Sequence, residues 1–536
     1  MPDALTAINL RRTPQSEQAD KRQVENSAGG YTFTVSDETR LRRFLVLGTE
    51  GGTYYTSQSE VTKDNAGVVL DWARQRSTEL VAEIVSLSTS GRAPRQNPAI
   101  FALAAAASLG DAEGRKAALD ALPLVARTGT HLFLFASYVE QFRGWGRGLR
   151  RAVADWYLSK PVDDVAYQAV KYRQRDGWTH RDLLRLAHPP TDETARKSLF
   201  NWICGRDNRE VPAIVDAFEN AQRATTVAGW LECIGSAPVS WEMLPDTALG
   251  EPAVWAALIE KGMPQTALMR QLPRLTRLGV LKPMSATGKT VAEQLADPEK
   301  LRKARVHPVN VLVAARTYAS GQSARGQGEW TPVAGIVDAL DGAFYAAFGA
   351  VEPAGKRTML ALDVSGSMTS AVAGMPLSCR EASAALALVT AATEPQHMIV
   401  GFTGSGNNWS YNTTSALTEL AISPRQRLDD AVSAVSNLPF GRTDCALPML
   451  HAQRNNLEVD TFCIYTDNET WAGTVHPHQA LRAYRQASGI DARLIVMAMT
   501  PTQFSIADPT DPGMLDIAGL DSAVPTLISD FSRRAI

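Results

Sequence analysis

The sequence predicts a multidomain protein in which an all-α array of helices is followed by an α/β domain with a doubly wound sheet. From about residue 36 to residue 348, apolar residues recur at helical spacing in segments of ten to eighteen residues, separated by Gly, Pro, Asn, Asp and Ser. Beyond Pro353, short β-rich runs alternate with helical segments, which is typical of a parallel sheet covered by helices. A chain of 536 residues is also too long for a single hydrophobic core.

We expect three regions along the chain. Residues 1–28 are polar and charged, with few large apolar side chains beyond Ile8 and Leu10, so burial cannot offset the entropy of ordering them. A disordered tail is therefore predicted there. Residues 29–350 are predicted to form the helical array, and residues 351–536 the α/β domain.

Helix start and stop signals support the array. Asn97 and Pro98 predict the cap and first turn of a helix that ends at Gly110. Further helices are predicted over 131–143, 147–159, 163–175, 194–204, 210–222, 251–261, 264–278, 289–304 and 333–348. A dozen or so helices with almost no strand pattern favour stacked helical repeats, although no fixed sequence period is visible.

The α/β domain follows from the alternation of its segments. Strands are predicted over 358–363, 397–403, 460–466 and 493–499, and helices over 379–393, 425–437, 444–456 and 477–488. In doubly wound sheets the ligand binds at the carboxyl ends of the strands. Polar residues that follow these strands are therefore the first candidates for a site.

A carboxylate and two hydroxyls, those of Asp363, Ser365 and Ser367, stand at the end of the strand 358–363. Mg²⁺ prefers oxygen ligands, keeps several waters and takes only one or two carboxylates. Later stretches add the hydroxyl of Thr443 and the carboxylate of Asp467. The five residues predict a divalent cation site, with Mg²⁺ as the first expectation and Mn²⁺ or Ca²⁺ as alternatives. The competing interpretation is a turn that uses Ser and Gly for backbone reasons.

Two neighbouring acids are second-tier candidates for the same site. Asp444 and Glu469 stand beside the predicted ligands, but capping or salt-bridging roles explain them equally well. No Gly-x-Ser-x-Gly, Walker loop or His-Glu-x-x-His motif occurs, and the eight histidines do not cluster with the acids in the sequence. We therefore expect no enzymatic activity.

Composition describes an ordinary soluble globular protein. The chain is 45% hydrophobic and 21% charged, with a formal net charge of −2, so global charge suggests no partner. Five widely spaced cysteines form no metal-binding or redox pattern, and buried free thiols are expected. No apolar stretch is long enough to span a membrane and the chain opens without a signal-peptide pattern, so a cytoplasmic protein is predicted.

One segment departs from the neutral balance. Residues 143–206 contain thirteen Lys or Arg against seven acids, a local net charge of +6, and aromatic residues lie among them, including Trp145, Trp156, Tyr157, Tyr172 and Trp178. Basic side chains neutralise phosphates and exposed rings stack on unpaired bases, so the segment is a candidate RNA-binding face. On composition alone, a solvated helix face with buried aromatics is the more common outcome.

Two resemblances extend these predictions. The Asp-x-Ser-x-Ser loop, the later Gly-x-Thr-Asp and the strand-terminal Asp resemble the metal-ion-dependent adhesion site of von Willebrand A domains. From about residue 30 to the end, the chain resembles the Ro autoantigen family. The stretches that carry this second resemblance are LGTEGGTYY (47–55), GWGRGLRRAVADWY (144–157), KYRQRDGWTHRDLLRLAH (171–188), TALMRQLPRL (266–275), ARVHP (304–308) and VEPAGKR (351–357).

The Ro resemblance implies a TROVE-type ribonucleoprotein core, in which HEAT-like helical repeats form a ring that the von Willebrand A (Rossmann-like) domain closes. It implies binding of small noncoding Y RNAs on a basic outer surface, and of single-stranded 3′ ends of misfolded RNAs through the ring. A 3′ exoribonuclease such as polynucleotide phosphorylase is the implied protein partner. The candidate RNA-binding residues are Lys171, Arg173, Arg175, His180 and Arg181, together with Arg147 and Arg150 of the same basic segment. For His180, a capping role after Thr179 is an equal alternative.

Two other functions compete with this one. A von Willebrand A site holds an acidic group of a partner at an open coordination position of the ion, so a metal-dependent protein-interaction module with incidental RNA binding is the main alternative. A metal-dependent hydrolase is the third, because an oxygen-ligated ion can activate water. No membrane partner is expected.

Overall fold

The computed structural model describes most of the chain. The residues it describes are 12–47, 58–90, 96–206, 210–323, 328–372, 376–403, 416–438, 442–468, 470–499, 504–520 and 524–535. Within them, no helix is long and apolar enough to cross a membrane.

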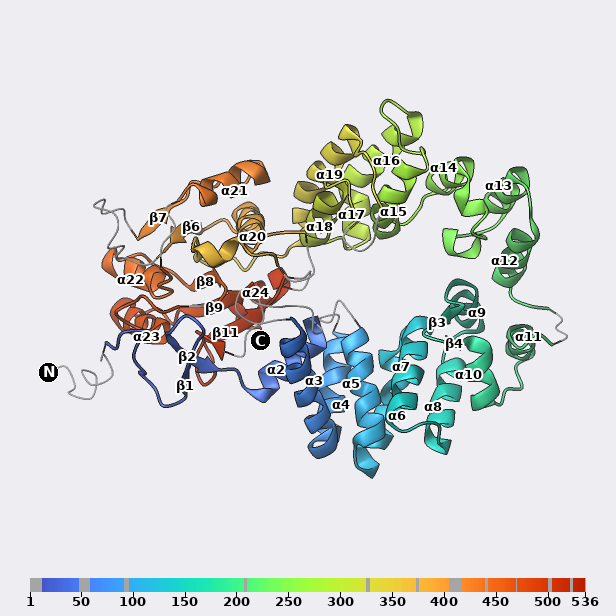
Figure 1. Cartoon of the computed structure of the whole chain (residues 1–536), viewed down its shortest axis with the longest axis horizontal. Coiled ribbons are helices and arrows are strands. Elements are labelled where there is room, and N and C mark those ends of the chain that lie inside the picture. Colours follow the sequence, from blue (N-terminus) through green and yellow to red (C-terminus); the bar gives the residue numbers. More distant parts are fainter. Residues whose placement is uncertain are drawn as a thin grey trace.

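Helices follow one another along an arc in the N-terminal part (Figure 1), as the apolar periodicity predicts. The α-helices of the arc are α2 (Asp37–Leu47), α3 (Gln58–Gln75), α4 (Ser77–Thr89), α5 (Asn97–Leu109), α6 (Ala112–Val125), α7 (Gly129–Phe142), α8 (Arg147–Leu158), α9 (Val162–Lys171), α10 (His180–Ala187), α11 (Thr194–Ile203), α12 (Ala213–Arg223), α13 (Val227–Ser236), α14 (Pro252–Glu260), α15 (Gln265–Arg277), α16 (Ala286–Ala296), α17 (Pro298–Lys303), α18 (Pro308–Ala319) and α19 (Ala334–Ala346). Short 3₁₀ turns, η1 (Trp241–Met243), η2 (Ala248–Gly250) and η3 (Ala347–Ala350), accompany them.

Three sequence-based helix assignments need correction. Helix α5 begins at Asn97 itself, so Gln96 and not Asn97 occupies the cap position. The helix predicted over 163–175 ends at Lys171, because the following chain forms the hairpin β3–β4 (Gln174–Arg175 and Trp178–Thr179) around Asp176 and Gly177, both at positive φ. The helix predicted over 289–304 is two helices, since Asp297 ends α16 and caps α17.

The C-terminal part contains one mixed sheet. Its described strands run in the order β11-β9-β8-β5-β6-β7, and all pairs except β6–β7 are parallel. The strands are β5 (Thr358–Asp363), β6 (His397–Phe402), β7 (Leu417–Glu419), β8 (Thr461–Thr466), β9 (Arg493–Ala498) and β11 (Met514–Ala518). The helices are α20 (Cys379–Thr393), α21 (Leu428–Ser436), α22 (Leu447–Arg454), α23 (Pro477–Ser488) and α24 (Val524–Ser532), with the turn η4 (Gly366–Thr369) after β5. The predicted α/β domain is thus confirmed, but its sheet is mixed and includes β7 and β11, which the sequence reading missed.

Residues 12–28 correct the predicted disordered tail; residues 1–11 lie outside the described part of the chain. Strand β1 (Gln23–Glu25) pairs with β2 (Tyr31–Thr34), which pairs in turn with β10 (Phe504–Ser505) from the other end of the chain. Gln15, Gln23 and Asn26 are all buried against the C-terminal domain. Hydrogen bonds of polar side chains hold this segment in place, which an argument from apolar burial could not predict.

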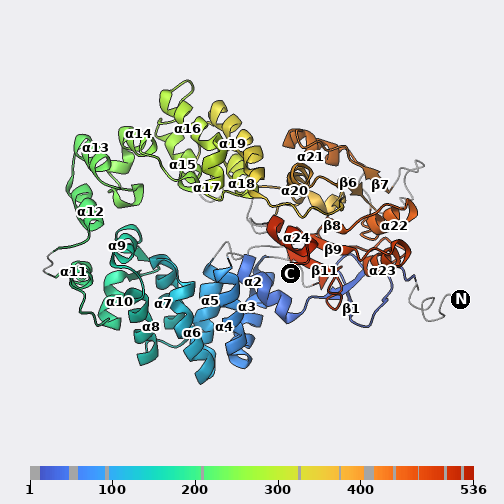
Figure 2. The same cartoon turned by 180° about the vertical axis from the view of Figure 1, so that it is seen from behind.

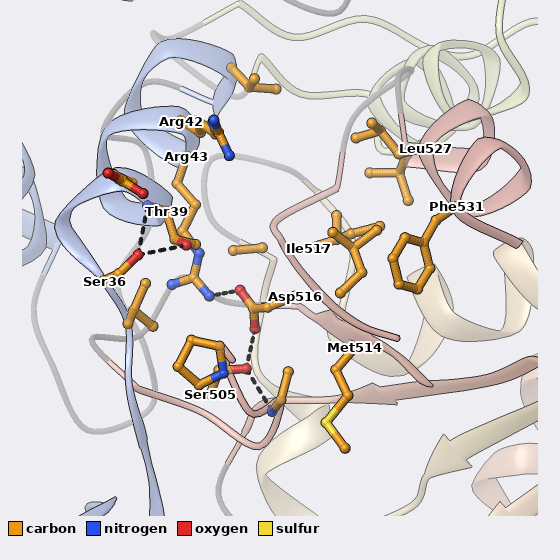
Figure 3. A pocket seen from close by; sticks show the side chains of 18 of the residues that line it. Ser36, Thr39, Arg42, Arg43, Ser505, Met514, Asp516, Ile517, Leu527 and Phe531 are labelled. Atoms are coloured by element: carbon orange, nitrogen blue, oxygen red, sulfur yellow. Dashed lines mark hydrogen bonds and ion pairs between the residues drawn. The ribbon is translucent and has the colours of Figure 1, made fainter. Parts of the chain in front are cut away.

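The arc of helices meets the C-terminal domain at both ends, so the elements close into a ring (Figures 1 and 2). At the first junction, Arg43 of α2 forms an ion pair with Asp516 of β11, and Ser505 Oγ donates to Asp516 Oδ1 at 2.5 Å. These residues line a cavity of about 670 Å³ between α2, β11 and α24 (Figure 3). Apolar side chains, including Ile517 and Phe531, line the cavity on the domain side.

The second junction uses exposed polar contacts instead. Arg316 of α18 pairs with Asp429 of α21 at 2.6 Å, and Arg427 lies 3.4 Å from Asp341 of α19. Tyr345 accepts a hydrogen bond from Leu428 N at 2.7 Å. Both ends of the helical array are therefore fixed to the same domain, by a buried ion pair at one end and exposed ones at the other.

Candidate metal centre and basic face

Asp363 is the last residue of β5, in the middle of the sheet, where it lies between β6 and β8. Every residue of this strand is buried, and Asp363 itself is 1% exposed. Its Oδ1 accepts from Ser365 N at 2.8 Å and its Oδ2 from Thr466 Oγ1 at 2.8 Å. The sheet topology thus places a buried carboxylate at the carboxyl end of the central strands, as predicted.

The serine hydroxyls lie together beside this carboxylate. Ser365 Oγ and Ser367 Oγ are 3.1 Å apart, and the turn η4 that carries Ser367 is anchored by the fully buried Met368. From α20, Arg380 donates to the carbonyl of Ser365 at 3.2 Å. The sequence did not point to Arg380, whose guanidinium stabilises the backbone of the loop that carries Ser365 and Ser367.

Asp467 lies close enough to Asp363 for their charges to interact. Burial first, and then the Asp467 carboxylate, raise the pKa of Asp363 to about 7. Two buried carboxylates that repel one another fit a divalent cation, which offsets both charges at once. The hydroxyls beside them are oxygen donors of the kind that Mg²⁺ accepts.

Thr443 is connected to this group through its neighbours. It is buried, and its carbonyl accepts from Trp471 N and Ala472 N, both at 3.1 Å. Cys445, two residues later, places its Sγ 3.8 Å from Thr466 Oγ1, the group that donates to Asp363. The Thr443 loop and the carboxyl end of β8 therefore form one hydrogen-bonded unit beside the candidate ligands.

The two second-tier candidates for the cation site are Asp444 and Glu469. Asp444 is buried, and its Oδ1 accepts from Ala446 N at 3.0 Å and from Gln15 Nε2 at 2.8 Å, so the structure gives it a local structural role. Burial raises the pKa of Asp444 to about 6. Glu469 lies outside the described residues. Among the described residues, no group of three or more His, Cys, Asp and Glu could hold a metal ion.

The basic residues lie on a short stretch of the arc. Arg147 and Arg150 are exposed on α8, Arg173 and Arg175 on the segment after α9, and Arg181 on α10. In Figure 1, α9 and β3–β4 lie toward the inside of the arc, while α8 and α10 lie toward its outer side. The exposed arginines therefore belong to neighbouring elements, some of which lie toward the inside of the arc and some toward its outer side.

Lys171 is less accessible than these arginines. It is half-buried, its Nζ lies 2.9 Å from Tyr167 Oη and 3.6 Å from Glu242 Oε1, and it stands over the Tyr167 and Tyr172 rings. Part of its charge is thus already neutralised within the protein. Tyr167, which the sequence reading passed over, is 37% exposed beside it.

His180 is wrongly assigned by the prediction that places it on an exposed RNA-binding face. It is 3% exposed and packs edge-on against Phe133, with its Nδ1 2.7 Å from Tyr157 Oη. Thr179 and Asp182 form a capping box that fixes His180 as the first residue of α10 and directs its ring into the core. Burial lowers the pKa of His180 to about 4, so the ring is neutral at pH 7.

The aromatic residues named in the basic segment pack mostly against the protein core, as the alternative of a solvated helix face with buried aromatics predicts. Trp156 and Tyr157 are fully buried. Trp145, Tyr172 and Trp178 are half-buried, and the rings of Trp145 and Trp178 lie 5.2 Å apart beside the hairpin.

Of the five cysteines, Cys379, Cys445 and Cys463 are buried, whereas Cys204 and Cys233 are only half-buried; all are free.

Comparisons with known proteins find matches along nearly the whole chain. Residues 24–227 and 235–317 match the TROVE domain model, and residues 357–532 match the Ro60 vWA domain model. The chain is 43% identical to RNA-binding protein RO60 of Deinococcus radiodurans over 99% of both chains. It is 38% identical to RNA-binding protein RO60 of Caenorhabditis elegans, over 97% of this chain and 92% of that protein.

A solved structure agrees with the fold. The crystal structure of the Deinococcus radiodurans RO (RSR) protein matches 94% of this chain and 100% of its own, at 41% identity and a TM-score of 0.75. The resemblance inferred from the sequence motifs is thereby confirmed, except that most of the stretch 47–55 lies outside the described residues. With both domain models matched in order and relatives aligned over nearly the full length, the chain belongs to the Ro60 family.

Proposed function

We propose that this protein is a non-enzymatic RNA-binding scaffold. The observation that carries the proposal is the group of exposed arginines on α8, on the segment after α9 and on α10, in a segment of net charge +6 within a chain of net charge −2. Two relatives that align over almost the whole chain are named RNA-binding proteins. Lys and Arg side chains supply the phosphate contacts on which RNA affinity depends.

The family resemblance supports a more specific ligand. We propose small noncoding Y RNAs, together with misfolded RNAs that have single-stranded 3′ ends, as the bound species. The scaffold would act in noncoding RNA quality control or processing, in the cytoplasm, and a 3′ exoribonuclease would use the bound RNA as its attachment point. Single-stranded ends and loops present unpaired bases, which proteins recognise more readily than the deep groove of an RNA duplex.

Binding to a structured RNA with a single-stranded 3′ tail tests the proposal. The affinity should fall as salt rises, with a log–log slope of roughly −0.7 to −0.9 per phosphate contacted. The variant Arg173→Ala/Arg175→Ala/Arg181→Ala should weaken binding by about 2–3 kcal/mol and make the slope shallower by about 2–3. The matched control is Lys289→Ala/Arg302→Ala/Lys303→Ala, which removes three exposed charges from α16 and α17. Equal losses in both variants would show non-specific electrostatics and refute this face.

The candidate metal centre supports a second function. Asp363, Ser365, Ser367, Thr443 and Asp467 would hold a divalent cation, with Mg²⁺ favoured over Mn²⁺ and Ca²⁺ because the set has few carboxylates. The ion would supply an open coordination position for an acidic group of a protein partner. Titration calorimetry with Mg²⁺ tests the site: the wild type should bind and Asp363→Ala should not, while RNA affinity stays the same in both. Loss of RNA binding in Asp363→Ala would contradict two independent sites.

A further inference from the structure

Gln15 is a completely buried residue near the start of the sequence whose side-chain amide contacts the loops beside the candidate metal centre. Its exposed fraction is 0%, and its partners lie more than 400 residues later in the chain. The side chain donates from Nε2 to Asp444 Oδ1 at 2.8 Å and to the Val475 carbonyl at 2.9 Å. Its Oε1 accepts from Thr470 Oγ1 at 2.5 Å. The amide therefore uses both donors and its acceptor.

The backbone of the same residue is held as firmly. Gln15 N donates to the Gly473 carbonyl at 2.9 Å, and Tyr31 N donates to the Gln15 carbonyl at 2.8 Å. A Cβ on Gly473 would meet Gln15 Nε2 at 2.2 Å, so a larger residue there does not fit. Segment 12–26, here called the N-terminal strap, thus fits closely against the loop 470–476 that follows β8.

The groups that Gln15 joins are direct neighbours of predicted ligands. Asp444 follows Thr443, and Thr470 Oγ1 accepts from Cys445 N at 3.1 Å. The loop after β8 is fixed to the Thr443 carbonyl by two backbone donors, Trp471 N and Ala472 N. Gln15 adds a second connection, because its side chain hydrogen-bonds both Asp444, next to Thr443, and Thr470, in the loop after β8. A residue of the N-terminal strap thus helps to fix the position of Thr443 relative to the end of β8.

We infer that Gln15 is a positioning residue for the cation site, and that the N-terminal strap is part of the construction of that site although it supplies no ligand. The inference rests on the proposed cation site. Groups that orient ligands from behind contribute strongly to affinity, and their loss typically weakens metal binding about 10-fold to 100-fold. Removal of the Gln15 amide also takes one hydrogen bond from each of the buried side chains of Asp444 and Thr470, which favours movement of both loops.

The matched comparison uses two glutamines of the same strap. Gln23 is also buried, but it binds His476 and the backbone of Ala19 and Asp20. Titration calorimetry with Mg²⁺ and Mn²⁺ electron paramagnetic resonance should show affinity lowered at least about 10-fold in Gln15→Ala and less than about 2-fold in Gln23→Ala. Equal weakening in the two variants would mean that only the general stability of the strap matters, and would overturn a specific role for Gln15.

A second pair of variants protects the test against misfolding of Gln15→Ala. Thr470→Val removes the hydroxyl that donates to Gln15, and Thr470→Ser keeps it. Weaker Mg²⁺ binding in the valine variant with recovery in the serine variant supports the inference, and wild-type affinity in Thr470→Val refutes it. RNA affinity, measured on the same samples, should stay unchanged. No Mg²⁺ binding by the wild type would remove the cation site itself, whereas wild-type binding that Gln15→Ala retains would remove only the role of Gln15.

Discussion

Arg43 and Asp516 form an ion pair between side chains that are 7% and 8% exposed and stand 473 residues apart in the sequence. Arg43 belongs to the first helix of the array and Asp516 to the edge strand β11, so the pair joins the two parts of the molecule. Asp516 also accepts from Ser505, whose strand β10 pairs with β2. Its side chains are much less exposed than those of the ion pairs Arg316–Asp429 and Arg427–Asp341 at the second junction.

Replacement of one residue of the Arg43–Asp516 pair should lower the free energy of unfolding. Arg43→Ala leaves Asp516 buried without its cation, and removal of one member of a buried pair typically costs about 3–5 kcal/mol. The melting temperature should drop, and hydrogen exchange of α2 and β11 should accelerate. The double variant Arg43→Leu/Asp516→Leu should recover much of the loss, because no charge remains buried. An exposed pair, probed by Arg316→Ala, should change the melting temperature little.

The buried imidazole of His180 should make the helical array sensitive to acid. Its pKa is about 4 when folded and about 6.5 when unfolded, so the unfolded state binds more protons between these values. The stability that neutral His180 contributes is present above pH 6.5 and is lost as the pH falls through 4, by roughly 3 kcal/mol. Urea unfolding followed by helical circular dichroism from pH 7 to pH 4 measures this.

His180→Gln should reduce the pH dependence over that range. The control is His188→Gln, an exposed histidine at the end of the same helix, which should keep the wild-type slope. Burial also lowers the pKa of the half-buried His131 and the buried His307 to about 4, and these two residues contribute to both variants alike. Identical slopes in the wild type and His180→Gln would contradict the burial of this imidazole.

Single substitutions should rank the basic residues by accessibility. Arg181→Ala removes an exposed charge and should weaken RNA binding by about 1 kcal/mol, as expected for one phosphate contact. Lys171→Ala should have a smaller effect on affinity and on the salt slope, because Glu242 and Tyr167 already hold its ammonium group. Filter binding at several salt concentrations measures both quantities. A larger loss for Lys171 would mean that RNA displaces Glu242.

The ion-free metal centre should be strained at neutral and alkaline pH. Burial raises the pKa of Asp363 above its unfolded value, so its contribution to stability is greatest below pH 4 and is lost as the pH rises through about 7. In EDTA at pH 8, Asp363→Asn should therefore melt at a higher temperature than the wild type. Added Mg²⁺ should stabilise the wild type and leave Asp363→Asn unchanged. A lower melting temperature of Asp363→Asn in EDTA would contradict this charge repulsion.

The sequence predicted what local patterns encode. Strand β5 and helix α23 begin and end where the hydrophobic pattern places them, and the predicted ligand loop follows β5 directly. Strand β11 was missed because Asp516 interrupts the apolar run of Met514–Ala518. His180 was misplaced because the capping box that turns its ring inward depends on Thr179 and Asp182, and burial by Phe133 is a tertiary effect.

The contacts of Gln15 escaped prediction for another reason. A single polar residue in a polar segment carries no periodic signal, and its partners lie in loops more than 400 residues away. Such contacts depend on the final arrangement of two domains and not on any local preference. The same holds for Arg43, whose basic neighbourhood gives no indication of the carboxylate that it meets.

The N-terminal strap has a consequence for the order in which the molecule is made. Residues 12–34 are synthesised long before residues 444–505, which contain the C-terminal contacts of Gln15, Asn26 and β2. Contacts of such long sequence separation form late in folding. The strap therefore lacks its C-terminal partners through most of the synthesis of the chain. Ring closure is a post-synthetic step, and chains that terminate early will expose an unpaired β1–β2 hairpin edge to other nascent proteins.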